Sequence, residues 1–173
     1  MQSLKYLNVN VTNLFIVLII PFLILGPFLP DLTVSISALL FLYYVIKNKN
    51  FYYFNHKLFI IFLLFCILCI VSSLRSENIL FSLKSSLFYF RIGVFSCLVW
   101  YLIDKDKSIL NYFYYILILC FSALAIDGYY QYFNEENIFG FKISGIRVSS
   151  FFGDELVMGS YLSRLFPLLF ALF

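Results

Sequence analysis

Charged side chains are scarce in this sequence. Only 12% of its 173 residues are Asp, Glu, Lys or Arg, about half the share found in soluble domains. Hydrophobic residues make up 63% of the chain, and the mean hydropathy is +0.96. A soluble globule of this length could not bury so much apolar surface, so we predict an integral membrane protein built from hydrophobic helices.

Residues that commonly carry chemistry are also few. His56 is the single histidine, and Cys66 and Cys69, although spaced as C-x-x-C, have no second pair or histidine nearby. All four cysteines lie in apolar runs, where they act as small buried hydrophobes. The net charge of +3 is too small and too dispersed to indicate nucleic acid. We therefore expect no metal, no cofactor and no nucleic-acid partner.

Several segments that indicate other protein classes are missing as well. The first apolar run continues too far for a cleavable signal and has no A-x-A site. We find no internal repeat and no low-complexity linker in the sequence. Neither the paired carboxylates of a glycosidase nor a glycine-rich phosphate loop followed by lysine occurs. These absences favour a metal-independent mechanism if the protein is an enzyme.

What the sequence does contain is a series of apolar stretches, each near the length of about 20 residues that a membrane-crossing helix needs. We predict six spans, at residues 12–29, 32–46, 58–73, 86–103, 109–126 and 156–173. Pro27, Pro30 and Asp31 form a tight turn between the first two. The predicted fold class is an all-α polytopic bundle, with one domain over residues 1–173 and an outer-face loop at about 127–155. Because the last apolar run reaches Phe173 without a polar tail, we expect this chain to be the N-terminal part of a longer protein.

Basic residues in the short loops predict the orientation, because lysine and arginine accumulate on the cytoplasmic side of a membrane. A cytoplasmic N-terminus places more basic residues inside the cell than outside it. Those inside are Lys5, Lys47, Lys49, Lys57, Lys105 and Lys107, and those outside are Arg75, Lys84, Lys142 and Arg147. We therefore predict that the N-terminus is cytoplasmic and that the loop at 127–155 lies on the outer side.

Two arginines fall inside apolar stretches, where a cation at mid-helix costs about 2.5 to 3.5 kcal/mol. Arg91 lies in the fourth stretch and Arg164 in the sixth. Arg91 either has an inward-facing partner or lies near enough to the outer end for its side chain to reach the headgroups. Arg164 lies deeper, and it either pairs with a carboxylate or helix carbonyls or binds a ligand.

The most specific stretch of the chain covers residues 140–155. It contains three glycines, three serines, two cations and the acidic pair Asp154 and Glu155. Asp154 is suited to cap the N-terminus of the next helix, which is an ordinary structural role. Arg147 stands among glycines that let backbone approach and serines that can donate, an arrangement suited to gripping a phosphate bidentately. The alternative is that Arg147 is a solvated loop residue.

Four segments, taken in order, carry a resemblance to a known family. They are D-G-Y-Y-Q-Y-F from Asp127, N-I-F-G from Asn137, R-V-S-S-F-F-G-D-E from Arg147 and G-S-Y-L-S-R-L-F-P-L from Gly159. Together they resemble the O-antigen ligase and polymerase superfamily of polytopic membrane glycosyltransferases. The resemblance implies about ten to twelve helices in the bacterial inner membrane, around a site at its outer face. It also implies transfer of a glycan from an undecaprenyl-pyrophosphate carrier to lipid A core or to a growing polysaccharide.

The resemblance implies roles for individual residues. Arg147 matches the arginine that opens the family's turn and would bind the donor pyrophosphate, with Arg91 and Arg164 as further candidates for that role. Ser150 and Asp154 would support the loop.

The sequence also departs from the family pattern. Phe152 matches the aromatic residue of the turn, but Ser150 stands where glycine is usual and Glu155-Leu156 where Pro-Asn is common. The family's large outer loop, whose histidine is linked to acceptor activation, has no counterpart here. His56 falls on the predicted cytoplasmic side and cannot replace that histidine.

Glycan transfer from a polyprenyl pyrophosphate requires mainly that the protein position the substrates. The leaving group is already good, so the protein must orient two lipid-linked substrates and stabilise the charge on the departing pyrophosphate with preorganised cations. We expect a part of a glycan ligase or polymerase, inactive by itself, whose partners are the undecaprenyl-linked donor, a lipid or glycan acceptor and membrane lipids. The alternatives are a transporter or flippase segment in which Arg91 and Arg164 line a substrate path, and a non-catalytic membrane scaffold.

Overall fold

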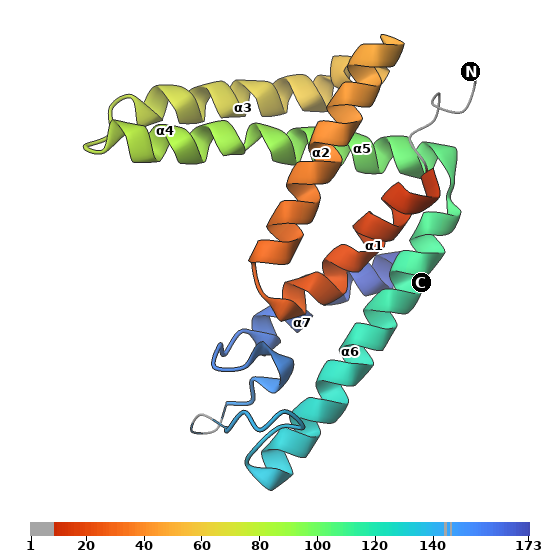
Figure 1. The fold of residues 1–173 in the computed structure, drawn as a ribbon, viewed down its shortest axis with the longest axis vertical. Helices are drawn as coiled ribbons and strands as arrows, with labels where there is room; N and C mark the ends of the chain where they lie inside the picture. Colours follow the sequence, from red (N-terminus) through yellow and green to blue (C-terminus); the bar gives the residue numbers. More distant parts are fainter. Residues whose placement is uncertain (1–8, 144, 146) are drawn as a thin grey trace. The chain divides into compact units, whose positions relative to one another are not determined.

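The computed structural model describes residues 9–143, 145 and 147–173, and this part of the chain is helical with no named strand (Figure 1). The elements in order are α1 (Val9–Leu25), α2 (Phe28–Asn48), the 3-10 helix η1 (Tyr52–Asn55), α3 (Lys57–Ser73), α4 (Ile79–Phe88), α5 (Phe90–Lys105), α6 (Ser108–Asn134), the 3-10 helix η2 (Ser150–Phe152) and α7 (Met158–Leu172). Helices α4 and α5 meet at Tyr89 and form one apolar rod, Ile79–Lys105. The predicted all-α fold class is confirmed.

Three of these helical segments are long and apolar enough to cross a membrane, judged by length and composition. They are α2, the α4–α5 rod and α6, of 21, 27 and 27 residues. Shorter apolar helices of 10–17 residues, at Thr12–Leu25, Lys57–Ser73 and Met158–Leu172, overlap the other predicted spans. The structure therefore establishes three helices of membrane-crossing length, whereas a bundle of about six spans stays a prediction.

The chain divides into two compact units. The first unit comprises residues Met1–Ile16 and Asp31–Asp106, and the second comprises Val17–Pro30 and Lys107–Phe173.

In the first unit, α3 runs antiparallel to the α4–α5 rod (Figure 1). Small residues let the two approach closely. The Ser73 hydroxyl is hydrogen-bonded to that of Ser86, and the Ser76 hydroxyl lies 2.7 Å from that of Ser82. A Cβ atom added at Gly93 would come within 2.3 Å of the Phe62 ring. Close packing of this kind is how apolar helices associate where water supplies no driving force.

Aromatic rings fill the end of the first unit near η1. Tyr53 packs edge-on against Trp100 and Tyr101, with ring centroids 5.3 and 5.6 Å apart, and the Tyr101 hydroxyl donates to the Tyr44 hydroxyl at 3.1 Å. Burial, followed by a hydrogen bond to the Asp104 carboxylate, raises the pKa of Tyr53 to about 12. The phenol therefore stays neutral at physiological pH and serves as a hydrogen-bond donor.

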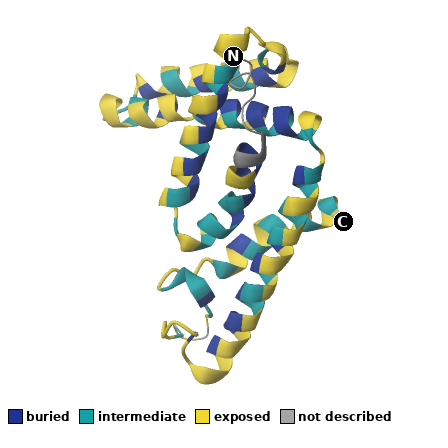
Figure 2. Ribbon diagram, turned by 45° about the vertical axis from the view of Figure 1, so that its right-hand side comes forward, coloured by how far each residue is buried: buried dark blue, intermediate teal, exposed yellow. Residues whose placement is uncertain are grey.

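In the second unit, α6 packs against α7. Leu117, Cys120 and Leu124 are buried on one side of α6 together with Ile20 and Tyr161, and buried positions recur along that helix in Figure 2. The Tyr161 hydroxyl donates to the Ile20 carbonyl at 3.1 Å. This apolar core fixes the end of α6 from which the site is built.

Helix α6 continues past the predicted end of the fifth span. It ends at Asn134 rather than near residue 126, so residues 127–134 of the predicted outer loop are helical. Asp127 and Gln131, one turn apart, face the interior of the unit and not solvent. Their polar groups therefore end the apolar run without ending the helix.

Two predicted helix boundaries are wrong. Helix α7 begins at Met158 with Val157 at its N-cap and no side-chain cap, so Asp154 does not cap it. Pro30 and Asp31 lie in the first turn of α2, where proline is tolerated because the first backbone amides have no intrahelical partner. The break between α1 and α2 falls at Gly26, whose φ of 126° is accessible to glycine.

Candidate functional site

The described residues of the loop that follows α6, 135–143, 145 and 147–157, fold back on the last two turns of that helix. Glu135 ends α6 in the left-handed conformation, with φ of 64°. The Ile143 amide then donates to the Glu135 carbonyl at 2.8 Å, and Glu136 forms an antiparallel bridge with Lys142. The chain thus reverses within a few residues of the helix end.

Asn137 organises the tip of this reversal. Its side-chain oxygen accepts from the backbone amides of Phe139 and Phe141, at 3.0 and 2.8 Å. Its own amide donates to the Phe141 carbonyl at 2.9 Å, and Gly140 turns the chain with φ of 85°. The side-chain nitrogen of Asn137 remains to bond elsewhere, and it donates to the Ser150 carbonyl at 2.9 Å.

The Asp127 carboxylate receives hydrogen bonds from three donors of the loop. The Ser150 hydroxyl donates at 2.7 Å, the Ile138 amide at 3.2 Å and the Asn137 side-chain amide at 3.4 Å. Asp127 itself is fully buried. A carboxylate only accepts, so it matches a pocket formed by donors alone.

Gln131, one helical turn later, both accepts and donates. Its oxygen accepts from the backbone amides of Ser149 and Ser150, at 3.0 and 2.7 Å. Its nitrogen donates to the Phe141 carbonyl at 3.0 Å and to the Ser149 hydroxyl at 3.3 Å. The amide therefore bridges the start and the end of the loop.

We call Asp127, Gln131, Asn137, Ser149 and Ser150 the polar cluster. None of the five is more than 3% exposed, and all have hydrogen-bond partners. A buried polar group left without a partner costs about 1 to 3 kcal/mol, so a fully satisfied cluster gives the loop one defined conformation.

Four members of the polar cluster were missed as site residues in the sequence. A signal was present, because Asp127 and Gln131 have i, i+4 spacing at the end of an apolar run, which places them on one helix face. Asn137 precedes Gly140 in a sequence typical of a turn. What the sequence could not show is that these groups turn inward and meet.

Ser150 has an unusual backbone conformation within this cluster. Its φ is 52°, in the left-handed region that favours glycine, and it is fully buried. In the superfamily that the sequence resembles, glycine is usual at this position. Here the serine hydroxyl offsets the conformational cost with its bond to Asp127.

Ser150→Ala is expected to open the loop more than Ser150→Gly. Both variants lose the hydroxyl, but only glycine also relieves the left-handed strain, which is about 1 to 2 kcal/mol. Limited proteolysis of the loop should therefore be several-fold faster for the alanine variant, because cleavage follows the population of the open form. Equal or faster cleavage of the glycine variant would contradict this account.

Arg147 lies two residues before Ser149, the first of the two serines that are hydrogen-bonded to Gln131. Its side chain is exposed, and its guanidinium has no hydrogen bond or ion pair with any residue that the structure describes, whereas its backbone lies in an isolated bridge. Asp154 is exposed in the turn after η2, and Arg164 is exposed on α7. The second unit thus contains four of the five predicted site residues, of which Ser150 alone belongs to the polar cluster.

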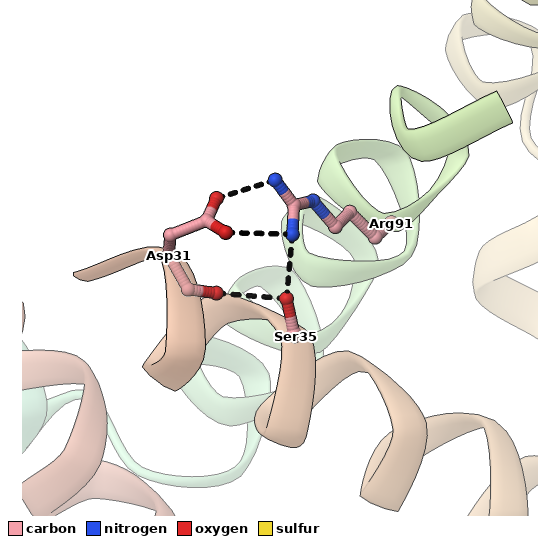
Figure 3. Close-up of polar contacts among 3 residues, drawn as sticks. All are labelled: Asp31, Ser35 and Arg91. Carbon is pink, nitrogen blue, oxygen red and sulfur yellow. Dashed lines mark hydrogen bonds and ion pairs between the residues drawn. The ribbon is translucent and has the colours of Figure 1, made fainter. Parts of the chain in front are cut away.

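Arg91 lies in the first unit and is engaged within the chain (Figure 3). Its two terminal nitrogens form a bidentate ion pair with Asp31, and one of them also donates to the Ser35 hydroxyl at 2.7 Å. The Ser35 hydroxyl in turn donates to the Asp31 carbonyl at 2.8 Å. Arg91 therefore has a partner within the chain, as one of the two sequence interpretations expects, but the Asp31 side chain is 57% exposed and does not face inward.

Comparison with known proteins adds no relative. No protein-family model, curated protein or solved structure matches the chain.

Proposed function

We propose that the chain forms the donor-binding part of a polytopic membrane glycan ligase or polymerase in the bacterial inner membrane. The protein transfers a glycan from undecaprenyl pyrophosphate to lipid A core or to a growing polysaccharide at the outer face. The observation that carries the proposal is the polar cluster, because it ties the loop bearing Arg147 to the end of a helix of membrane-crossing length.

The length of α6 supports a position for this loop at the membrane surface. Its 27 residues span about 40 Å, whereas the hydrocarbon core is about 30 Å thick. The last turns of α6 therefore extend into the headgroup layer. Tyr129, Tyr132 and Phe133 are exposed there, by 71%, 58% and 77%, and aromatic residues of this kind gather at the interface.

The free guanidinium of Arg147 supports a role in binding the diphosphate of the donor. Arginine presents a planar fork of donors that matches two phosphate oxygens. When the acceptor hydroxyl attacks the anomeric carbon, the bond from that carbon to the pyrophosphate oxygen breaks and negative charge grows on the leaving group. A cation already held in place stabilises that charge without reorganising.

The polar cluster also supports the resemblance on which the proposal rests. Asp127 with Gln131, Asn137, and Ser149 with Ser150 come from the first three of the four resembling segments, and in the fold they meet. These three segments of the chain thus form one local structure. The left-handed backbone at Ser150, where the family usually has glycine, agrees with this interpretation.

The proposal requires Arg147 to lie on the outer side of the membrane. In cells that express Arg147→Cys, a membrane-impermeant maleimide is expected to label the protein from outside, beyond the background of the four native cysteines, which lie in apolar helices. Lys57→Cys, at the start of α3, is the matched control and is expected to react only after the membrane is permeabilised. Labelling of position 147 from the cytoplasmic side alone would refute the proposed function.

A further inference from the structure

Lys84 and Arg91 line one open cavity of about 530 Å³ in the first unit, together with Asp31. They are seven residues apart on the α4–α5 rod, close to two full turns, and so lie on the same side of it. The remaining lining residues are Phe81, Ser85, Phe88, Tyr89 and Ile92. The cavity therefore combines two cations and one carboxylate with largely apolar and aromatic walls.

The charges in this cavity do not cancel. Asp31 neutralises Arg91 through the bidentate ion pair. The Lys84 ammonium has no ion pair or hydrogen bond with any residue in the described part of the chain. One positive charge is thus left for an anion, and it sits in a helical rod that is apolar enough to cross a membrane.

The position of Lys84 along the rod matches the depth of lipid phosphates. It lies five residues after Ile79, the first residue of the rod, which is about 8 Å along the helix axis. The headgroup layer on each side of a bilayer is about 5 to 8 Å thick. If the rod crosses the membrane, the Lys84 ammonium reaches the phosphate level, where a long side chain keeps its charge hydrated.

We propose that this cavity binds the phosphodiester headgroup of an anionic membrane lipid, with Lys84 as the ion-pair partner. The apolar surroundings favour a lipid over free phosphate. Phe81 and Phe88 are 75% and 51% exposed, and an adjoining hollow shared by Lys84 and Phe88 is lined by Leu80, Leu83 and Leu87. These side chains would contact the glycerol and the upper acyl chain, which inorganic phosphate lacks. The inference rests on the membrane placement in the proposed function, but not on glycan transfer.

The test uses the full chain in nanodiscs in which phosphatidylglycerol replaces part of the phosphatidylcholine. Lipid retained by the purified protein after mild detergent washing is counted by mass spectrometry. Lys84→Gln is expected to lower the enrichment of phosphatidylglycerol about fivefold, the effect of one cation near an anionic surface. Lys84→Arg should keep the enrichment, and Lys57→Gln, which removes the same charge from the exposed start of α3, should leave it unchanged.

Unchanged enrichment in Lys84→Gln would overturn the inference, as would equal loss in Lys57→Gln. Inorganic phosphate is added in a parallel arm, and displacement of phosphatidylglycerol by an equal concentration of it would overturn the lipid assignment in favour of free phosphate. Resistance of the protein to alkaline carbonate extraction reports membrane insertion separately. A protein that stays inserted but shows no lipid preference would refute this inference and leave the proposed function intact.

Discussion

Replacing Arg147 by alanine is expected to reduce glycan transfer in cells by about 10²- to 10³-fold. This is the loss that follows removal of one preorganised group that stabilises charge in a transition state. Arg147→Lys is expected to restore only part of the activity, because an ammonium is a point charge and cannot bind two phosphate oxygens in one plane. The measurement is the amount of glycan-modified acceptor in a strain that lacks the native gene.

The control is Lys142→Ala in the same loop, which should leave glycan transfer unchanged. Lys142 is also exposed, and its contribution to the loop is a backbone bridge that alanine retains. The Arg147 guanidinium has no hydrogen bond or ion pair with a described residue, so the Arg147→Ala protein should accumulate to the normal level. Undiminished transfer by Arg147→Ala would remove the assigned role.

Asp127→Asn and Gln131→Glu are each expected to loosen the loop by about 1 to 3 kcal/mol, the cost of an unsatisfied buried polar group. Both substitutions preserve shape and change only which atoms donate. In Asp127→Asn an NH₂ group replaces one carboxylate oxygen, so it faces either the Ile138 amide, which donates to Oδ1, or the Ser150 hydroxyl and the Asn137 side-chain amide, which donate to Oδ2. In Gln131→Glu an oxygen replaces the nitrogen that donates to the Phe141 carbonyl and the Ser149 hydroxyl.

Hydrogen exchange measures this loosening directly. The amides of Ile138, Ser149 and Ser150, which bond to Asp127 or Gln131, should exchange roughly 10- to 100-fold faster in the variants. Glu136→Gln removes an acidic charge from an exposed position of the same loop and should leave these rates unchanged. If Asp127→Asn behaves like Glu136→Gln, the polar cluster does not hold the loop.

Much of the helical architecture could be predicted from apolar run length. The third predicted span, at 58–73, nearly coincides with α3, because Lys57 and the polar residues after Ser73 bound an uninterrupted apolar run. The predicted end of α6 is wrong because polar residues lie within the last turns of the helix. The charge of Asp127 predicts a position in the loop, yet Asp127 is helical and buried because the loop supplies donors for its carboxylate.

The site was only partly accessible to prediction. Local sequence indicated Arg147 and a turn near Ser150, because glycines, serines and a cation cluster there. It could not indicate that Gln131 would bind the amides of Ser149 and Ser150, since that contact joins residues 18 and 19 positions apart. Local sequence likewise could not indicate the ion pair between Arg91 and Asp31, because these residues are 60 positions apart.

The rigid coupling of α6 to its loop has a consequence for the choice of lipid. The polar cluster fixes the loop to Asp127 and Gln131. If α6 crosses the membrane as proposed, the height of Arg147 above the bilayer midplane is set by how α6 accommodates hydrophobic mismatch. Longer acyl chains would draw the guanidinium down toward the glycerol backbone, and shorter ones would lift it into water or tilt the helix. Membrane thickness would thus tune how well the arginine meets a diphosphate of fixed depth.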